Sequence, residues 1–217
     1  MALVFGGKAS TGVLIPLMIL ADIFAVKYYH RHTQWKYLRK LLPSMFAGVL
    51  LGVWLGNYIS EYVFKQVMAL FILATIVIMV WMDRKPQKQG ETEDKRIPKH
   101  WAFSSGMGLI SGITSMVGNL AGSFANIYFL AMRLPKNEFI GTAAWLFFII
   151  NVFKLPFHIF VWETVTVRSF MVDLLLIPAI VMGFYVGIAL VKLINNDLYR
   201  KFILAVTAAG AIMILLK

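Results

Sequence analysis

Residues 118–156 read GNLAGSFANIYFLAMRLPKNEFIGTAAWLFFIINVFKLP, a hydrophobic sequence with small and polar residues near its start. A long apolar run follows, and it contains Asn151 and Lys154. In hydrocarbon an unpaired backbone group is costly, so a broken helix is tolerated only where protein buries it or where it lines a polar cavity. The stretch therefore indicates a membrane protein with a candidate solute site at the break.

The composition indicates the same class of protein. Hydrophobic residues make up 60% of the 217 residues and charged residues only 14%, with a mean hydropathy of +0.77, which leaves too little polar surface to coat a soluble globule. A helix needs about 20 apolar residues to cross a membrane. Such runs lie at residues 11–29, 41–59, 64–82, 138–161, 167–191 and 198–216, and the broken segment covers residues 101–133. We therefore expect an all-α, polytopic integral membrane protein built as a helical bundle.

Basic residues give the chain a net charge of +11, and they gather in loops beside the apolar runs. The first loop, residues 27–40, contains no acid, and residues 83–100 are again rich in Lys and Arg. Because cytoplasmic loops carry an excess of Lys and Arg, we expect both segments to be cytoplasmic, in a plasma or inner membrane. Residues 83–100 mix both charges with Pro, Gly and Gln, as solvated linkers do. Charge placed in this way explains membrane orientation and gives no reason to expect a nucleic-acid partner.

The chain also repeats itself faintly across this linker. Asp22-Ile-Phe in the first part matches Asn151-Val-Phe in the second. The glycines at positions 52 and 56 likewise match those at 183 and 187. Secondary transporters are usually built from duplicated halves. We therefore expect a first-half bundle of three spans at residues 1–82, a linker at 83–100 and a second-half bundle at 101–217, with the broken segment and three spans.

The orientation of the two halves depends on whether residues 101–133 cross the membrane once or dip in and return. If they return, the basic residues of the second half lie inside and Arg168 is the main one outside, whereas a single crossing reverses this. The residues placed inside are Arg133, Lys136, Lys192, Arg200 and Lys201. We therefore expect a re-entrant hairpin and an inverted repeat. The first half has no counterpart of this hairpin before residue 11, so the chain is expected to be a fragment or to complete its site with another chain.

These segments resemble a known family. Residues 111–157, SGITSMVGNLAGSFANIYFLAMRLPKNEFIGTAAWLFFIINVFKLPF, are similar to the second-half signature of the TauE/SafE sulfite-exporter family of membrane permeases. Residues 7–56 resemble the segment that follows the family's first glycine-rich hairpin, which is absent here. The resemblance covers nearly the whole chain and implies transport of sulfite, thiosulfate, a sulfonate or a related organic anion. Where related sequences often have Gly-Pro, this chain has Gly122-Ser123.

Three residues at the break are candidates for substrate binding: Asn119, Gly122 and Ser123. Half-helices that meet inside a membrane point free backbone amides and positive dipole ends at the break, as an anion site requires. Asn and Ser donate hydrogen bonds without adding charge, and Gly lets the backbone approach a solute. The alternative is that the small residues only allow close helix packing. We expect this packing role for Ser111, Gly112, Thr114 and Ser115.

Further candidates lie on the following span. Asn151 and Lys154 are one helical turn apart and share a face, and Lys154 would supply a positive charge for an anion oxygen. The alternative is that Lys154 extends its ammonium to the membrane interface. Thr142 is a further substrate-binding candidate nearer the other end of this helix, where a hydroxyl more often bonds back to its own backbone.

Asp22 is the candidate for proton coupling, because a carboxylate in a low-dielectric environment binds a proton more readily. An alternative of equal weight is that Asp22 pairs with Lys154 or Lys27 and holds the halves together. His158 lies near the end of a span, where we expect it to be solvated. No histidine belongs to a metal-like cluster, so no metal or cofactor is expected.

Other function classes have less support in the sequence. No phosphate loop, nucleophile elbow or zinc-protease helix occurs, and the absence of cysteine excludes disulfides and cysteine nucleophiles, so we do not expect an enzyme. The alternative to a permease is a channel component or a non-transporting membrane subunit that needs a partner chain. Glycines at four-residue spacing indicate helix packing, within one chain or between copies in a homo-oligomer. They are Gly48, Gly52 and Gly56 in the first half and Gly183 and Gly187 in the second.

Overall fold

A computed structural model describes residues 7–56 and 101–215, together with residues 58, 60, 62, 66, 72, 73, 76 and 77. All secondary-structure elements in this part of the chain are helical, which confirms the expected all-α class. They are α2 (Gly7–Tyr29), the 3-10 helix η1 (His30–His32), α3 (Trp35–Leu55), α5 (Trp101–Gly118), α6 (Ala121–Ala131), α7 (Lys136–Phe160), α8 (Val167–Leu193) and α9 (Asn196–Leu215). The predicted linker at 83–100 and most of the predicted span at 64–82 lie outside the described residues.

Four helical segments of the described residues are long and apolar enough to cross a membrane: Thr11–His32, Trp35–Leu55, Lys136–Phe160 and Asp173–Leu193. By contrast, α6 has only 11 residues. At 1.5 Å per residue it is about 16 Å long, roughly half the thickness of the hydrocarbon core. The predicted break therefore separates α5 from a helix that is too short to span the membrane by itself.

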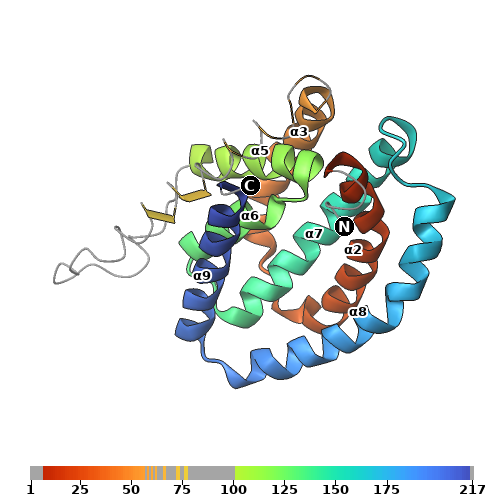
Figure 1. The fold of residues 1–217 in the computed structure, drawn as a ribbon. Helices are drawn as coiled ribbons and strands as arrows, with labels where there is room; N and C mark the ends of the chain where they lie inside the picture. The colour runs from red at the N-terminus through yellow and green to blue at the C-terminus, as the bar shows by residue number, and fades with distance from the viewer. Residues whose placement is uncertain are drawn as a thin grey trace.

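Helices α2 and α7 lie side by side in the middle of the molecule (Figure 1). They run in opposite directions. Tyr29, at the end of α2, lies beside Gly141 near the start of α7, and the backbone of Gly12 near the start of α2 abuts Thr164 just beyond α7. These are the helices that carry the matching Asp22 and Asn151 motifs of the two halves, so the predicted counterparts meet at the centre.

Helices α3 and α5 pack with their backbones in close approach. A Cβ added to Gly108 would lie 2.6 Å from the carbonyl oxygen of Leu41, and one added to Gly112 would lie 2.8 Å from the amide nitrogen of Val49. Further along, a Cβ on Gly52 would lie 2.8 Å from the Cβ of Met116. The contacts advance in the same direction along both helices, so α3 and α5 are parallel. The expected packing role of Gly48, Gly52 and Gly112 is therefore confirmed, because any side chain there would separate the helices.

The second pair of matched glycines behaves differently. Helix α8 curves around the outside of the molecule (Figure 1), and Pro178 lies within it. A proline removes one backbone hydrogen bond and bends a helix, which suits this course. Nothing in the described part of the chain lies within 4 Å of a Cβ added to Gly183 or Gly187. Packing of this pair within one chain is therefore not found among the described residues, and packing between copies stays a prediction.

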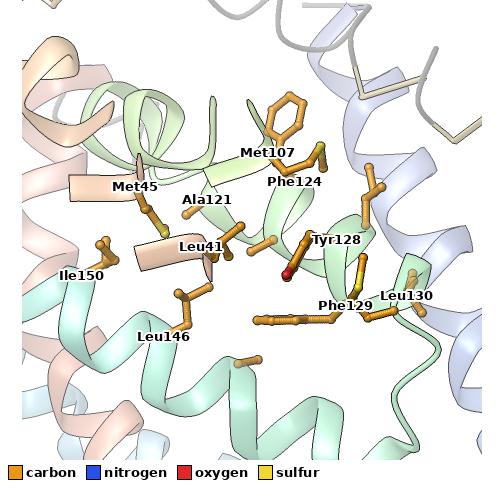
Figure 2. Packing of buried hydrophobic residues seen from close by; sticks show 14 of the residues in the cluster. Leu41, Met45, Met107, Ala121, Phe124, Tyr128, Phe129, Leu130, Leu146 and Ile150 are labelled. Carbon is orange, nitrogen blue, oxygen red and sulfur yellow. The ribbon is translucent and has the colours of Figure 1, made fainter. Parts of the chain in front are cut away.

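Helix α6 forms the centre of the hydrophobic core (Figure 2). Its Phe124, Tyr128 and Phe129 are at most 1% exposed, and they belong to the same cluster as Met45 of α3 and Leu146 of α7. The short helix is therefore surrounded by protein, as a membrane requires wherever a helix is interrupted.

Basic side chains donate hydrogen bonds to the ends of several helices at one end of the molecule. Arg200 Nη1 donates a hydrogen bond to the carbonyl oxygen of Leu130 at 2.6 Å, and Lys136 Nζ donates to that of Val191 at 2.9 Å. In the first loop, Thr33 Oγ1 donates to the carbonyl oxygen of Gly141 at 3.2 Å. Basic groups at helix C-termini satisfy free carbonyl groups and complement the helix dipole. The first loop, the end of α6 and the start of α7 therefore lie at the same end.

Candidate functional site

The break between α5 and α6 is a two-residue turn, Asn119 and Leu120, in which Asn119 has a left-handed backbone. Asn119 has φ 54°, a conformation that asparagine adopts more readily than most residues with a side chain. The amide of Leu120 donates to the carbonyl oxygen of Thr114 at 3.0 Å and closes the last turn of α5. In the described chain, the backbone amides of Ala121 and Gly122 have no backbone acceptor, as expected for the first turn of a helix.

Lys154 reaches this break from α7, and its side chain is 0% exposed. Its Nζ donates to Asn119 Oδ1 at 2.5 Å, and to both the carbonyl oxygen and the Oγ of Ser115 at 3.3 Å. An ammonium group has three donors, and here three uncharged acceptors receive them. The alternative in which Lys154 extends to the membrane interface does not apply, because the charge lies inside the protein.

Asn119 also joins the break to the first half of the molecule. While its Oδ1 accepts from Lys154, its Nδ2 donates to the carbonyl oxygen of Thr11 at 3.1 Å. Thr11 lies near the start of α2, so a single side chain connects the buried ammonium group to the other half.

Asp22 and Asn151 form the neighbouring polar pair. Asn151 Nδ2 donates to Asp22 Oδ2 at 2.7 Å, and Asn151 is buried while Asp22 is half-buried. The carboxylate therefore connects the halves through Asn151 rather than by the expected contact with Lys154 or Lys27. Asp22 and Lys154 nevertheless lie close enough to interact electrostatically.

The structure does not bring every candidate to this cluster. Gly122 and Ser123 lie in the first turn of α6, half-buried, and are not among the acceptors of Lys154. The nearest atoms to a Cβ on Gly122 are 3.8 Å away, so packing does not require a glycine there. Thr142 lies 12 residues before Lys154, about 18 Å along α7. Its Oγ1 accepts a hydrogen bond from the amide of Gln34 at 2.9 Å, so it bonds to the other half and not to its own helix.

Two residues of the cluster were not expected there. Ser115 was assigned a packing role, yet it supplies two of the three acceptors of Lys154. His158 was expected to be solvated, yet it is 0% exposed. One signal identifies His158 in the sequence: it follows Asn151 by seven residues and Lys154 by four, so the three share one face of a helix. No comparable signal identifies Ser115, because its role depends on where α5 lies relative to Lys154 of α7 in the folded protein.

No group of three or more His, Asp or Glu residues in the described part of the chain is arranged to hold a metal ion. The cluster instead offers one buried cation, amide and hydroxyl groups, and one carboxyl group. Such groups bind and release an anion or a proton, and none of them is an activated nucleophile.

Comparison with known proteins identifies the family. The family model described as "Sulfite exporter TauE/SafE" matches residues 1–214. No curated protein and no solved structure matches the chain. Members of the matched family are transporters and not enzymes, which agrees with the function class expected from the sequence. The chain therefore belongs to the TauE/SafE sulfite exporter family of membrane permeases.

Proposed function

We propose that this permease carries a small anion such as sulfite, thiosulfate, a sulfonate or a related organic anion, and that the anion binds at the break between α5 and α6. The observation that carries the proposal is the full burial of Lys154 against uncharged partners. A buried charge is costly unless a counter-charge accompanies it. An anion at the break supplies that counter-charge, and the first-turn amides of α6 favour it further.

Anion binding would also alter the contact between the halves. All three donors of Lys154 are occupied, so an anion oxygen that reaches Nζ must displace an acceptor. Asn119 is the acceptor that also holds Thr11 of the first half. Displacing Asn119 therefore weakens a bond between the halves at the moment of binding, which links substrate binding to alternating access of residues 1–82 and 101–217.

Contacts between the outer ends of α5 and α6 support a re-entrant hairpin, and with it an inverted repeat. Near the start of α5, Ser104 Oγ donates to the hydroxyl of Tyr128 near the end of α6 at 3.3 Å, and the ring of Phe103 stacks on that of Tyr128 with centroids 6.0 Å apart. Because α5 and α6 meet at the ends that lie farthest from the break, this segment would enter and leave the membrane on the same side. In this arrangement the basic end of the molecule and residues 83–100 face the cytoplasm of a cell with the permease in its plasma or inner membrane.

Proton coupling through Asp22 follows from its charge. While ionised, Asp22 is a negative charge that acts on Lys154 and therefore competes with an anion for it. Protonation removes this competitor and raises the affinity for the anion. Proton and anion then bind together and move in the same direction, as in secondary active transport.

The test is uptake of labelled sulfite, thiosulfate and methanesulfonate into liposomes that contain the purified chain, with a pH gradient imposed in either direction. Saturable uptake is expected from the native chain, no uptake from Lys154→Gln, and normal uptake from Lys192→Gln, which alters an exposed lysine of α8. Normal uptake by Lys154→Gln would refute the assigned site. No uptake by the folded native chain would refute transport by this chain alone and favour a membrane subunit that needs a partner chain.

A further inference from the structure

His158 is a buried histidine with one ring nitrogen occupied. Its Nδ1 lies 2.8 Å from Thr164 Oγ1, and the ring of Trp162 packs edge-on against it with centroids 5.1 Å apart. Within the described part of the chain, Nε2 is buried and has no hydrogen-bond partner. Buried polar groups are nearly always paired, so an unpaired ring nitrogen in a transporter requires an explanation.

The contacts of Thr164 bear on which ring nitrogen of His158 carries the hydrogen. A hydroxyl group has one hydrogen to donate, and that of Thr164 lies 2.8 Å from His158 Nδ1 and 3.3 Å from the carbonyl oxygen of His158. That carbonyl already accepts from the amide of Thr164 at 2.9 Å. Because Nδ1 is the nearer of the two acceptors, we assign the hydroxyl hydrogen to Nδ1, and in the neutral ring the hydrogen then lies on Nε2. With this assignment the unpaired nitrogen is a donor.

This donor lies beside the anion site. His158 follows Lys154 by four residues on the same face of α7, and the ammonium group acts electrostatically on the ring. Thr164, which holds His158, abuts the backbone of Gly12. The adjacent residue Thr11 accepts the hydrogen bond of Asn119. His158, through Thr164, and Asn119 therefore both connect to the start of α2, and Lys154 is bonded to Asn119.

We propose that the Nε2–H of His158 is a further anion-binding donor of this permease, which contacts one oxygen of the solute while Lys154 holds another. This assignment rests on the proposed anion transport. It explains why a ring nitrogen is left unpaired inside the protein: its acceptor is the solute. Thr164 acts as a positioning residue, because its hydroxyl keeps the hydrogen on Nε2.

Two substitutions at position 158 separate this role from a structural one. Asn places an amide near the position of Nδ1, so His158→Asn retains the contact with Thr164 and loses the outer donor. Gln places its amide nitrogen near the position of Nε2, so His158→Gln retains the outer donor and loses the contact with Thr164. A structural role predicts that His158→Gln is the more damaged variant, whereas an anion-binding role predicts the reverse.

The measurement is the KM for labelled sulfite in the liposome assay. In His158→Asn we expect KM to rise about tenfold with little change in the maximal rate, as for a lost hydrogen bond to a charged group. A ratio of the KM of His158→Asn to that of His158→Gln above about three supports the proposal, and a smaller ratio overturns it. His32→Asn, which changes an exposed histidine, serves as the control and should match the native chain.

A second readout applies if either variant does not transport. Thermal stabilisation of the purified variants by sulfite then gives an apparent dissociation constant for each. The ratio of this constant in His158→Asn to that in His158→Gln replaces the ratio of KM values. The two proposals fail in different ways. Native protein that neither takes up nor binds sulfite, thiosulfate or methanesulfonate overturns the proposed function and this assignment with it. Native protein that transports sulfite, with a ratio below the threshold, overturns only the role of His158.

Discussion

Replacing Gly112 with Ala tests whether the close approach of α3 and α5 maintains the site. A Cβ at this position would lie 2.8 Å from the amide nitrogen of Val49 and 2.9 Å from the carbonyl carbon of Gly48, and the carbonyl oxygen of Met45 would be nearer still. All three atoms belong to the backbone of α3, so no side-chain rotation relieves the overlap. Because carbon–oxygen contacts between helices are normally about 3.3 Å or longer, the helices must separate by about 1 Å.

The cost follows from what lies between the helices. A gap of about 1 Å forfeits up to roughly half of the dispersion energy of the atoms that face it. Leu41, Met45 and Val49 of α3 are fully buried and lose contacts in this way. Overpacking of this kind costs about 3 kcal/mol, and the better helix propensity of alanine returns about 1 kcal/mol. We therefore expect a net loss of about 2 kcal/mol and an unfolding temperature lower by about 5 °C.

The functional effect should be larger than the loss of stability. Helix α5 carries Ser115 and leads directly to Asn119, so its displacement lengthens the contacts of Lys154. A displacement of about 1 Å in a functional site can reduce a rate by about a hundredfold, and we expect uptake of sulfite to fall by about tenfold or more.

The control is Gly106→Ala on the same helix, because nothing in the described part of the chain lies within 4 Å of a Cβ there. Both variants should be compared by thermal unfolding in detergent and by uptake of labelled sulfite. Gly106→Ala should match the native chain in both assays. A Gly112→Ala variant with native stability and native uptake would refute the packing argument, and equal losses in both variants would show that the effect is not local.

Three further substitutions test individual contacts. Asn119→Gly keeps the left-handed backbone and removes both side-chain hydrogen bonds, so it should lose uptake. Asn119→Ala should lose uptake as well and should also be less stable by about 1 kcal/mol. Equal unfolding temperatures for the two variants would contradict the role of the backbone. Asp22→Asn should transport sulfite with a flattened dependence on pH, because the competing charge is absent at every pH; an unchanged profile would leave Asp22 a structural residue. Thr142→Val removes the acceptor for the Gln34 amide, so it should lower the free energy of unfolding by about 1 kcal/mol without altering the KM for sulfite. A raised KM would indicate that Thr142 belongs to the anion site.

The amino-acid sequence alone determined the class of this protein, the break and the family. Long apolar runs require a membrane, because no other environment accepts so much hydrophobic surface. The small and polar residues that interrupt residues 101–133 predicted a broken helix, and the chain turns at Asn119 between α5 and α6. These are local properties, which depend on the residues in one segment and on the solvent around it.

The partners of the polar residues were decided by the tertiary structure. Lys154 was a candidate from its position within an apolar run, but only the tertiary structure shows that its side chain reaches Ser115 of α5 and Asn119 at the break. The same applies to His158, which is buried because the chain after α7 folds back to place Thr164 against it. Each residue turns a helix by about 100°, so the face of a helix that points inward depends on its neighbours in space, and those neighbours are remote in the sequence.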